Sequence, residues 1–248
     1  MIKIVGTNLE VFPLCLGGNV FGWSADESQS QAVLDAFTAS GGNFIDTADV
    51  YSEWVDGNVG GESESIIGNW MKSRGNRHSL VIATKVAKLS SRPGLRPENI
   101  IAACNDSLKR LQTDHIDLYQ MHHIDRTAPA DEIWQAMDQL VSQGKITYVG
   151  SSNFPGWKIA QMNERAQVRH SLGLVSEQSL YNLIERRAEL EVIPACKEYG
   201  LGVITWSPLS GGLLALNDDD GTGRRQSKSI KSAAQSRSDQ LTRFGDLC

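Results

Sequence analysis

The chain has 248 residues, of which 40% are hydrophobic and 21% charged, so it can bury a sizeable core. Its formal net charge of −5 gives no electrostatic reason to expect a nucleic acid or an anionic membrane as a partner. There is no signal-peptide pattern, no apolar stretch near the roughly 20 residues that span a bilayer, and no C-x-x-C pair among the cysteines. We therefore expect a cytoplasmic protein without a structural metal or a disulfide framework.

The chain begins with a predicted β-hairpin over residues 1–12, with its turn near Gly6. After it, short apolar runs rich in β-branched residues alternate with longer amphipathic segments. The short runs, predicted as strands, are 13–18, 43–47, 80–86, 116–122, 146–152, 174–178 and 202–209. The amphipathic segments, predicted as helices, are 28–41, 63–75, 96–112, 129–145, 156–169 and 186–200.

This alternation predicts an α/β protein with parallel strands joined by helical crossovers. An open doubly wound sheet and a closed (β/α)8 barrel (a TIM barrel) both fit the pattern. The dinucleotide fingerprint G-x-G-x-x-G should follow the first strand of a doubly wound sheet, and "LGGNVFG" does not supply it. The sequence therefore favours the barrel, as a single domain over residues 1–248.

Polar residues follow the predicted strands at the end where barrel enzymes place their chemistry. Taken one at a time, each could be a cap on a buried strand, and Tyr51 could be a half-buried packing residue. A row of them at one rim predicts a site instead. The residues at these strand ends are Asp46, Lys85, His122, Ser152, Asn153, Gln178 and Trp206.

Three of these rim residues, together with Tyr51, suit the reduction of a carbonyl group. Tyr51 would donate the proton, although an unperturbed phenol has a pKa of about 10. A nearby ammonium, Lys85, would lower that pKa, and Asp46 would hold the ammonium in place. His122 would orient the carbonyl oxygen. Because no side chain carries a hydride, this chemistry implies a nicotinamide cofactor.

The motifs "FIDTADVY", "IATK", "DLYQMHH", "GSSNF", "EQSLYN" and "WSPLSGGLL" resemble the aldo-keto reductases. The similarity is to the branch that contains bacterial oxidoreductases and the potassium-channel β subunits, and it runs from about residue 1 to residue 214. The resemblance implies NADP(H) as the cofactor and Asp46, Tyr51, Lys85 and His122 as a catalytic tetrad, with Tyr51 as the general acid.

The same resemblance implies roles for further residues. Ser152, Asn153 and Gln178 would hydrogen-bond the nicotinamide carboxamide, and Trp206 would stack on the ring. Ser207 and Leu209 would contact the pyrophosphate through their backbone, and Asp46 would lie near the nicotinamide ribose. As simpler alternatives, Gln178 is a strand cap and Trp206 a core residue. We expect an apolar substrate pocket from the rim residues Phe21, Trp23 and Trp54, with His122.

The sequence becomes polar after Leu214, and apolar residues at helical spacing predict a further helix with a basic outer face. The resemblance implies an eighth strand, an eighth helix and a cationic clamp on the adenosine 2′-phosphate, and no motif here matches them. We therefore expect the barrel domain to be incomplete at its C-terminus, and the preference for NADP over NAD to be reduced.

The sequence thus predicts an NADP(H)-dependent reductase of a small aldehyde or ketone. The alternatives are a cofactor-binding regulatory or sensor subunit on the same fold and an inactive truncated form. The expected partner is a small carbonyl substrate rather than a nucleic acid or a membrane. We expect a monomer if the barrel is complete.

Overall fold

The computed structural model describes residues 1–212 and 214. These residues belong to two compact units: Met1–Ser179 with Ala188–Ile204, and Leu180–Arg187 with the chain from Thr205 onward. The helix predicted after Leu214 lies outside the described residues.

An antiparallel hairpin opens the chain, as predicted. Strand β1 (Ile2–Lys3) pairs with β2 (Glu10–Val11), and Gly6 takes a φ of 72° in the turn between them. The buried side chains of Ile4, Leu9 and Val11 pack against residues of the main sheet such as Phe44, Val81 and Leu118. The hairpin therefore covers an apolar layer of that sheet.

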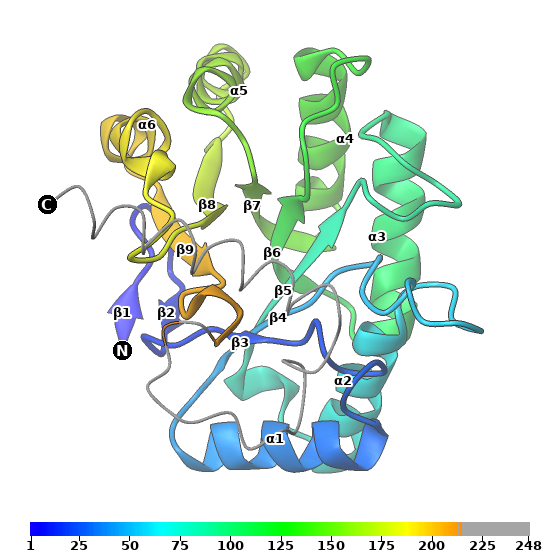
Figure 1. The fold of residues 1–248 in the computed structure, drawn as a ribbon. Helices are drawn as coiled ribbons and strands as arrows, with labels where there is room; N and C mark the ends of the chain where they lie inside the picture. Colours follow the sequence, from blue (N-terminus) through cyan, green and yellow to red (C-terminus); the bar gives the residue numbers. More distant parts are fainter. Residues whose placement is uncertain (213, 215–248) are drawn as a thin grey trace, which may run out of the picture. The chain divides into compact units, whose positions relative to one another are not determined.

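Within the described residues, the main sheet has seven strands in the order of the sequence (Figure 1). Neighbouring strands from β3 to β8 pair in parallel register. A doubly wound sheet reverses its strand order at a switch point, whereas a barrel sheet does not. The sequential order therefore confirms the predicted barrel type of α/β fold. The strands are β3 (Leu16–Gly17), β4 (Phe44–Asp46), β5 (Val81–Val86), β6 (Ile116–Met121), β7 (Ile146–Ser152), β8 (Leu174–Leu180) and β9 (Gly202–Trp206).

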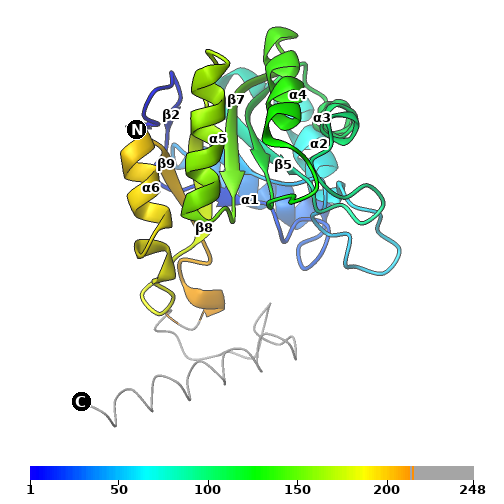
Figure 2. The ribbon, with the colours of Figure 1, turned by 90° about the horizontal axis from the view of Figure 1, so that it is seen from above.

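The helices of the larger unit lie side by side around the outer side of its strands (Figures 1 and 2). They are α1 (Glu27–Ala39), α2 (Glu62–Arg74), α3 (Pro97–Leu111), α4 (Ala130–Ser142), α5 (Gly156–Val168) and α6 (Val192–Tyr199). Each lies within a segment predicted as helical or within one residue of it.

Helix α6 is shorter than the predicted segment 186–200, because Arg187–Glu189 forms a separate 3-10 turn. The physical reason is Pro194. A proline cannot donate a backbone hydrogen bond and is tolerated only in the first turn of a helix, so the helix cannot begin much before Val192.

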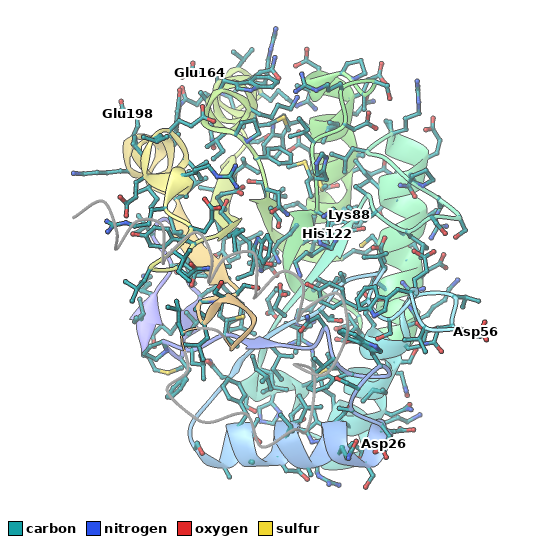
Figure 3. All side chains as sticks on the ribbon, viewed as in Figure 1. Asp26, Asp56, Lys88, His122, Glu164 and Glu198 are labelled. Atoms are coloured by element: carbon teal, nitrogen blue, oxygen red, sulfur yellow. The ribbon has the colours of Figure 1, made fainter. Side chains whose placement is uncertain are left out.

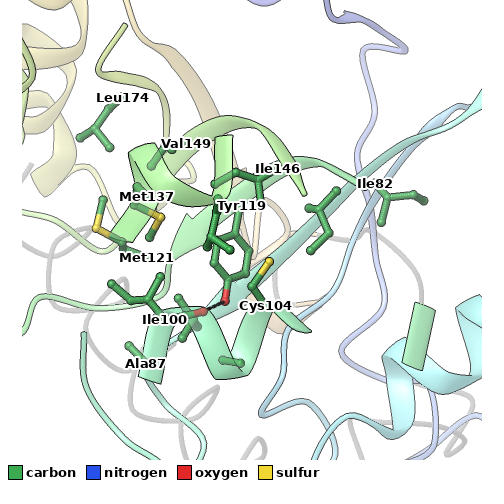
Figure 4. Packing of buried hydrophobic residues seen from close by; sticks show 14 of the residues in the cluster. Ile82, Ala87, Ile100, Cys104, Tyr119, Met121, Met137, Ile146, Val149 and Leu174 are labelled. Atoms are coloured by element: carbon green, nitrogen blue, oxygen red, sulfur yellow. Dashed lines mark hydrogen bonds between the residues drawn. The ribbon is translucent and has the colours of Figure 1, made fainter. Parts of the chain in front are cut away.

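The main core lies between the sheet and these helices. Figure 4 shows Tyr119 of β6 among Ile82, Cys104 and Ile146, with its hydroxyl donating to the carbonyl oxygen of Ile100 at 3.3 Å. Because side chains alternate along a strand, the neighbours of Tyr119 point to the opposite face of the sheet. That opposite face carries the polar residues described next.

No helix in the described part of the chain is long and apolar enough to cross a membrane.

Candidate active site

Lys85 of β5 is the centre of a buried polar cluster. Its side chain is 0% exposed. The ammonium donates to Asp46 Oδ2 at 2.5 Å, to the Thr47 carbonyl oxygen at 2.9 Å and to Tyr51 Oη at 2.8 Å. Burial by itself lowers the pKa of Lys85, but Asp46 and Tyr51 outweigh it, so the pKa is raised above its ordinary value. The ammonium stays protonated with an acceptor for each of its N–H groups.

Asp46, the last residue of β4, is held on its other oxygen by two amides. Its Oδ1 accepts from Gln120 Nε2 and from Gln178 Nε2, each at 2.9 Å. The sequence analysis missed Gln120. Gln120 lies two residues before His122, and side chains two residues apart point to the same face of a strand. This alternation could have predicted Gln120 as a site residue. The two amides fix the carboxylate that positions Lys85.

Tyr51 lies in the loop after β4, with its ring centroid 5.9 Å from that of His122 and 6.3 Å from that of Trp54. Burial raises the pKa of Tyr51 more than the Lys85 ammonium lowers it, so the net shift is upward from 10.0. The sequence analysis expected a lowered pKa, and this was wrong for the structure described here. The effect of Lys85 has the expected sign, but desolvation of the phenolate is larger.

His122 follows β6 and is a neutral imidazole in this environment. Burial, and then the charges of Lys85, Lys88 and His123, lower its pKa to about 2. Figure 3 shows His122 and Lys88 close together, away from the peripheral Asp26 and Asp56.

The Nδ1 atom of His122 is buried and has no hydrogen-bond partner within residues 1–212. Buried N–H groups without an acceptor are rarer than buried acceptors without a donor. This favours the tautomer in which Nε2 carries the proton and can donate it in a hydrogen bond.

Ser152, Asn153 and Gln178 come together at the ends of β7 and β8. The strand register pairs Ser152 with Gln178, and the Asn153 N–H donates to the Gln178 carbonyl oxygen at 3.0 Å. Asn153 Nδ2 donates to Ser152 Oγ at 2.9 Å and to the His122 carbonyl oxygen at 3.3 Å. The three residues therefore form one group of donors and acceptors next to His122.

Trp206, Ser207 and Leu209 lie in the smaller unit. Ser207 has a φ of 52°, and its carbonyl oxygen accepts from Asn182 Nδ2 at 3.0 Å and from the Ser210 N–H at 2.9 Å. These bonds shape a tight turn directly after β9. The tetrad lies in the larger unit, so the placement of this turn near the tetrad remains a prediction.

The three aromatic residues expected at the pocket have different environments. Trp54 is 51% exposed, and its ring centroid is 5.6 Å from that of Trp23 in an edge-to-face arrangement. Phe21 is 1% exposed and belongs to the hydrophobic core. Of these three residues, Trp54 therefore lies beside the ring of Tyr51, and Trp23 packs against Trp54.

A second buried acidic group lies between the sheet and α2. Glu64 of α2 is fully buried and accepts from Thr84 Oγ1 at 2.5 Å and from Arg110 Nε at 2.6 Å. Asp49 is 1% exposed, and no side chain of the described residues hydrogen-bonds to its carboxylate. Burial, and then the charge of Glu64, raise the pKa of Asp49 to about 7.

Asp49→Asn is expected to gain stability relative to wild type progressively as the pH rises from about 4 to about 7. The pKa of Asp49 rises from 3.8 to about 7 on folding, so the wild type takes up a proton on folding between these values and loses stability as the pH rises through them. Asparagine does not ionise. Urea unfolding should show the mutant gaining at least about 1 kcal/mol relative to wild type between pH 5 and pH 8, since one pKa unit corresponds to about 1.4 kcal/mol.

Asp35→Asn is the control for this prediction. The pKa of Asp35 is lowered to about 2 by its hydrogen bonds to Arg74 and Trp70, so that variant should gain nothing at pH 8. An Asp49→Asn protein that differs from wild type equally at both pH values would contradict the prediction.

Within residues 1–212, no group of three or more His, Cys, Asp or Glu side chains is placed to hold a metal ion.

A parallel sheet of consecutive strands, with helices outside it and a polar cluster at its carboxyl edge, defines a barrel-type α/β protein. The model of the "Aldo/keto reductase family" matches residues 13–246, and this chain belongs to that family of oxidoreductases.

Three relatives illustrate the range of similarity. "Uncharacterized oxidoreductase YrpG" of Bacillus subtilis (strain 168) is 46% identical over 254 residues, covering 98% of this chain and 76% of the relative. "Aryl-alcohol dehydrogenase [NADP(+)]" of Phanerodontia chrysosporium is 31% identical, over 87% of this chain and 60% of the relative. "Norsolorinic acid reductase B" of Aspergillus parasiticus is 34% identical, over 83% of this chain and 56% of the relative. The chain thus spans about three quarters of the first relative and less than two thirds of the other two.

Proposed function

We propose that this chain is an NADP(H)-dependent oxidoreductase that reduces a small aldehyde or ketone to an alcohol, with Tyr51 as the general acid. The observation that carries the proposal is the fully buried Lys85 ammonium, which hydrogen-bonds both Asp46 and Tyr51. The ring of His122 lies beside that phenol.

Each member of the tetrad has a distinct task in the reaction. The Tyr51 hydroxyl passes its proton to the carbonyl oxygen as negative charge develops there. The Lys85 ammonium, 2.8 Å from that hydroxyl, stabilises the phenolate that remains, and Asp46 anchors the ammonium. The neutral imidazole of His122 orients the carbonyl oxygen by donating a hydrogen bond from Nε2.

The cluster of Ser152, Asn153 and Gln178 fits a carboxamide, because hydroxyl and amide side chains offer both donors and acceptors to a group that needs both. A bound nicotinamide cofactor would supply the hydride. Trp206 would stack on its ring, the backbone at Ser207 and Leu209 would contact its pyrophosphate, and Asp46 would lie near its ribose. The similarity to the fungal aryl-alcohol dehydrogenase, whose name specifies NADP(+), supports NADP as the cofactor.

Oxidation of NADPH in the presence of a panel of aldehydes and ketones tests this proposal. Substrate-dependent loss of NADPH absorbance, with one equivalent of alcohol formed, is the expected result. Tight NADPH binding without turnover of any carbonyl compound would contradict it and favour a sensor role on the same fold.

Trp54→Ala is expected to raise KM for an aromatic aldehyde about threefold to tenfold and to leave kcat within about twofold. An aromatic pair contributes about 0.5–1.5 kcal/mol to binding beyond the effect of its buried area. Trp54 packs against the ring of Tyr51 but takes no part in the proton transfer. Trp157→Ala is the matched control, because this tryptophan is 49% exposed and lies on α5 next to Arg126. Steady-state kinetics measure KM and kcat of both variants. An equal change of KM in the two variants would contradict the assignment of Trp54 to the substrate pocket.

A further inference from the structure

Glu177 of β8 is a buried carboxylate that the proposed chemistry does not use. Its side chain is 0% exposed. Its Oε2 accepts from Ser151 Oγ at 2.5 Å, and its Oε1 accepts from Ser179 Oγ at 2.8 Å and from the Phe154 N–H at 3.0 Å. Hydroxyls and a backbone amide, rather than a cation, therefore satisfy this carboxylate.

The strand register places these bonds directly behind the candidate carboxamide site. Ser151 pairs with Glu177 and Ser152 pairs with Gln178, so the two pairs are neighbours along β7 and β8. Successive side chains of a strand point to opposite faces of the sheet. Ser152 and Gln178 thus lie on the face of the tetrad, and Ser151 and Glu177 lie on the face behind it.

The turn after β7 is attached to β8 at two successive amides. The Asn153 N–H donates to the Gln178 carbonyl oxygen, and the next N–H, of Phe154, donates to Glu177 Oε1. Between them Asn153 has a φ of 59°, a left-handed conformation that asparagine adopts more readily than most residues other than glycine. A conformation of this kind persists when surrounding bonds enforce it.

We propose that Glu177 is a positioning residue, which clamps the turn 151–154 to β8 and so holds Ser152 and Asn153 in place for the carboxamide of the cofactor. This inference rests on the proposed function. A side chain that only filled space here would need no charge, because a buried carboxylate is costly unless hydrogen bonds satisfy it. Glu177 meets three separate donors at once, and an apolar residue of the same size meets none.

The test compares Glu177→Leu, Glu177→Gln and a control variant, Asn163→Leu. Asn163 of α5 is also buried, and its Oδ1 accepts from the Leu174 N–H at 3.0 Å, at the start of the same strand β8. Asn163→Leu therefore removes a comparable buried acceptor at the opposite end of the strand. The measurements are the NADPH dissociation constant by calorimetry, the melting temperature, and hydrogen exchange of the cofactor-free protein.

Glu177→Leu is expected to raise the NADPH dissociation constant by at least about tenfold, by analogy with the loss of affinity when hydrogen bonds that orient metal-binding side chains are removed. It should also speed hydrogen exchange at Asn153 and Phe154. Glu177→Gln keeps an acceptor for the Phe154 N–H and should stay within about threefold of wild type in both measurements. Asn163→Leu should lower the melting temperature and speed exchange at Leu174, with the dissociation constant within about twofold of wild type.

Equal NADPH affinity in Glu177→Leu and Asn163→Leu would overturn the inference, and so would unchanged exchange at Phe154 in the Glu177→Leu protein. If Glu177→Leu fails to fold, Ser151→Ala replaces it, with a rise of at least about threefold in the dissociation constant expected and no rise overturning the inference. If wild-type protein binds no NADPH, the proposed function fails, and the positioning role falls with it. Faster exchange at Phe154 would then show that the clamp itself exists.

Discussion

Tyr51→Phe is expected to lower carbonyl reduction roughly 10²–10⁴-fold, the usual contribution of a general acid. The NADPH dissociation constant should stay within about twofold of wild type. The substitution removes the hydroxyl that accepts from Lys85 and leaves the ring with its neighbours Trp54 and His122. Steady-state turnover and calorimetric NADPH binding on the same preparation measure the two effects.

Tyr119→Phe is the matched control for this prediction. Tyr119 is also buried, but its hydroxyl donates to the Ile100 carbonyl oxygen on the helix side of the sheet. Its loss should reduce stability modestly and leave turnover unchanged. A Tyr51→Phe protein that keeps more than about a third of wild-type turnover would exclude Tyr51 as the acid.

Lys85→Met is expected to be comparably damaging to turnover and, in addition, to destabilise the protein. Methionine has a similar length but cannot donate to Asp46, Thr47 or Tyr51. Breaking a buried ion pair from one side costs about 3–5 kcal/mol, because the partner charge is left uncompensated. Thermal unfolding and single-turnover kinetics measure the two losses.

The pH profile separates the two possible roles of Lys85. The ammonium lowers the pKa of Tyr51 against the larger upward effect of burial. Its removal should therefore move the basic limb of the kcat/KM profile to higher pH. A loss of rate without that movement would show that Lys85 only positions the phenol. Lys158→Met, which removes a lysine bonded to Gln161 on α5, should change neither the rate nor the profile.

Local sequence patterns were sufficient to predict the strands and helices and the polar residues at the carboxyl ends of the strands. The alternation of short β-branched runs with amphipathic segments predicted the parallel sheet, and its sequential order confirmed the barrel type over the doubly wound type. Helix α6 shows that one further local signal went unused, because Pro194 alone limits where that helix can start.

Three features of the site could not be predicted in this way. Gln120 and Gln178 meet on Asp46 from positions far apart in the chain, and only the strand register brings their amides to one carboxylate. The partners of Glu177 depend on the same register. The pKa of Tyr51 depends on how completely the fold removes water from the phenol, which a list of neighbouring residue types does not contain.

The sequence by itself therefore determined which residues stand at the carboxyl ends of the strands. The alternation of side chains along a strand and the residues that end a strand are both local properties of the sequence. It also identified Asp46, Tyr51, Lys85 and His122 as candidates, since their chemistry suits one reaction. Only the tertiary structure decided which charges and amides face one another, that Phe21 is buried rather than accessible, and that burial outweighs the ammonium at Tyr51. The physical reason is that hydrogen-bond partners and desolvation depend on the register and packing of distant segments, which are set when the whole sheet assembles.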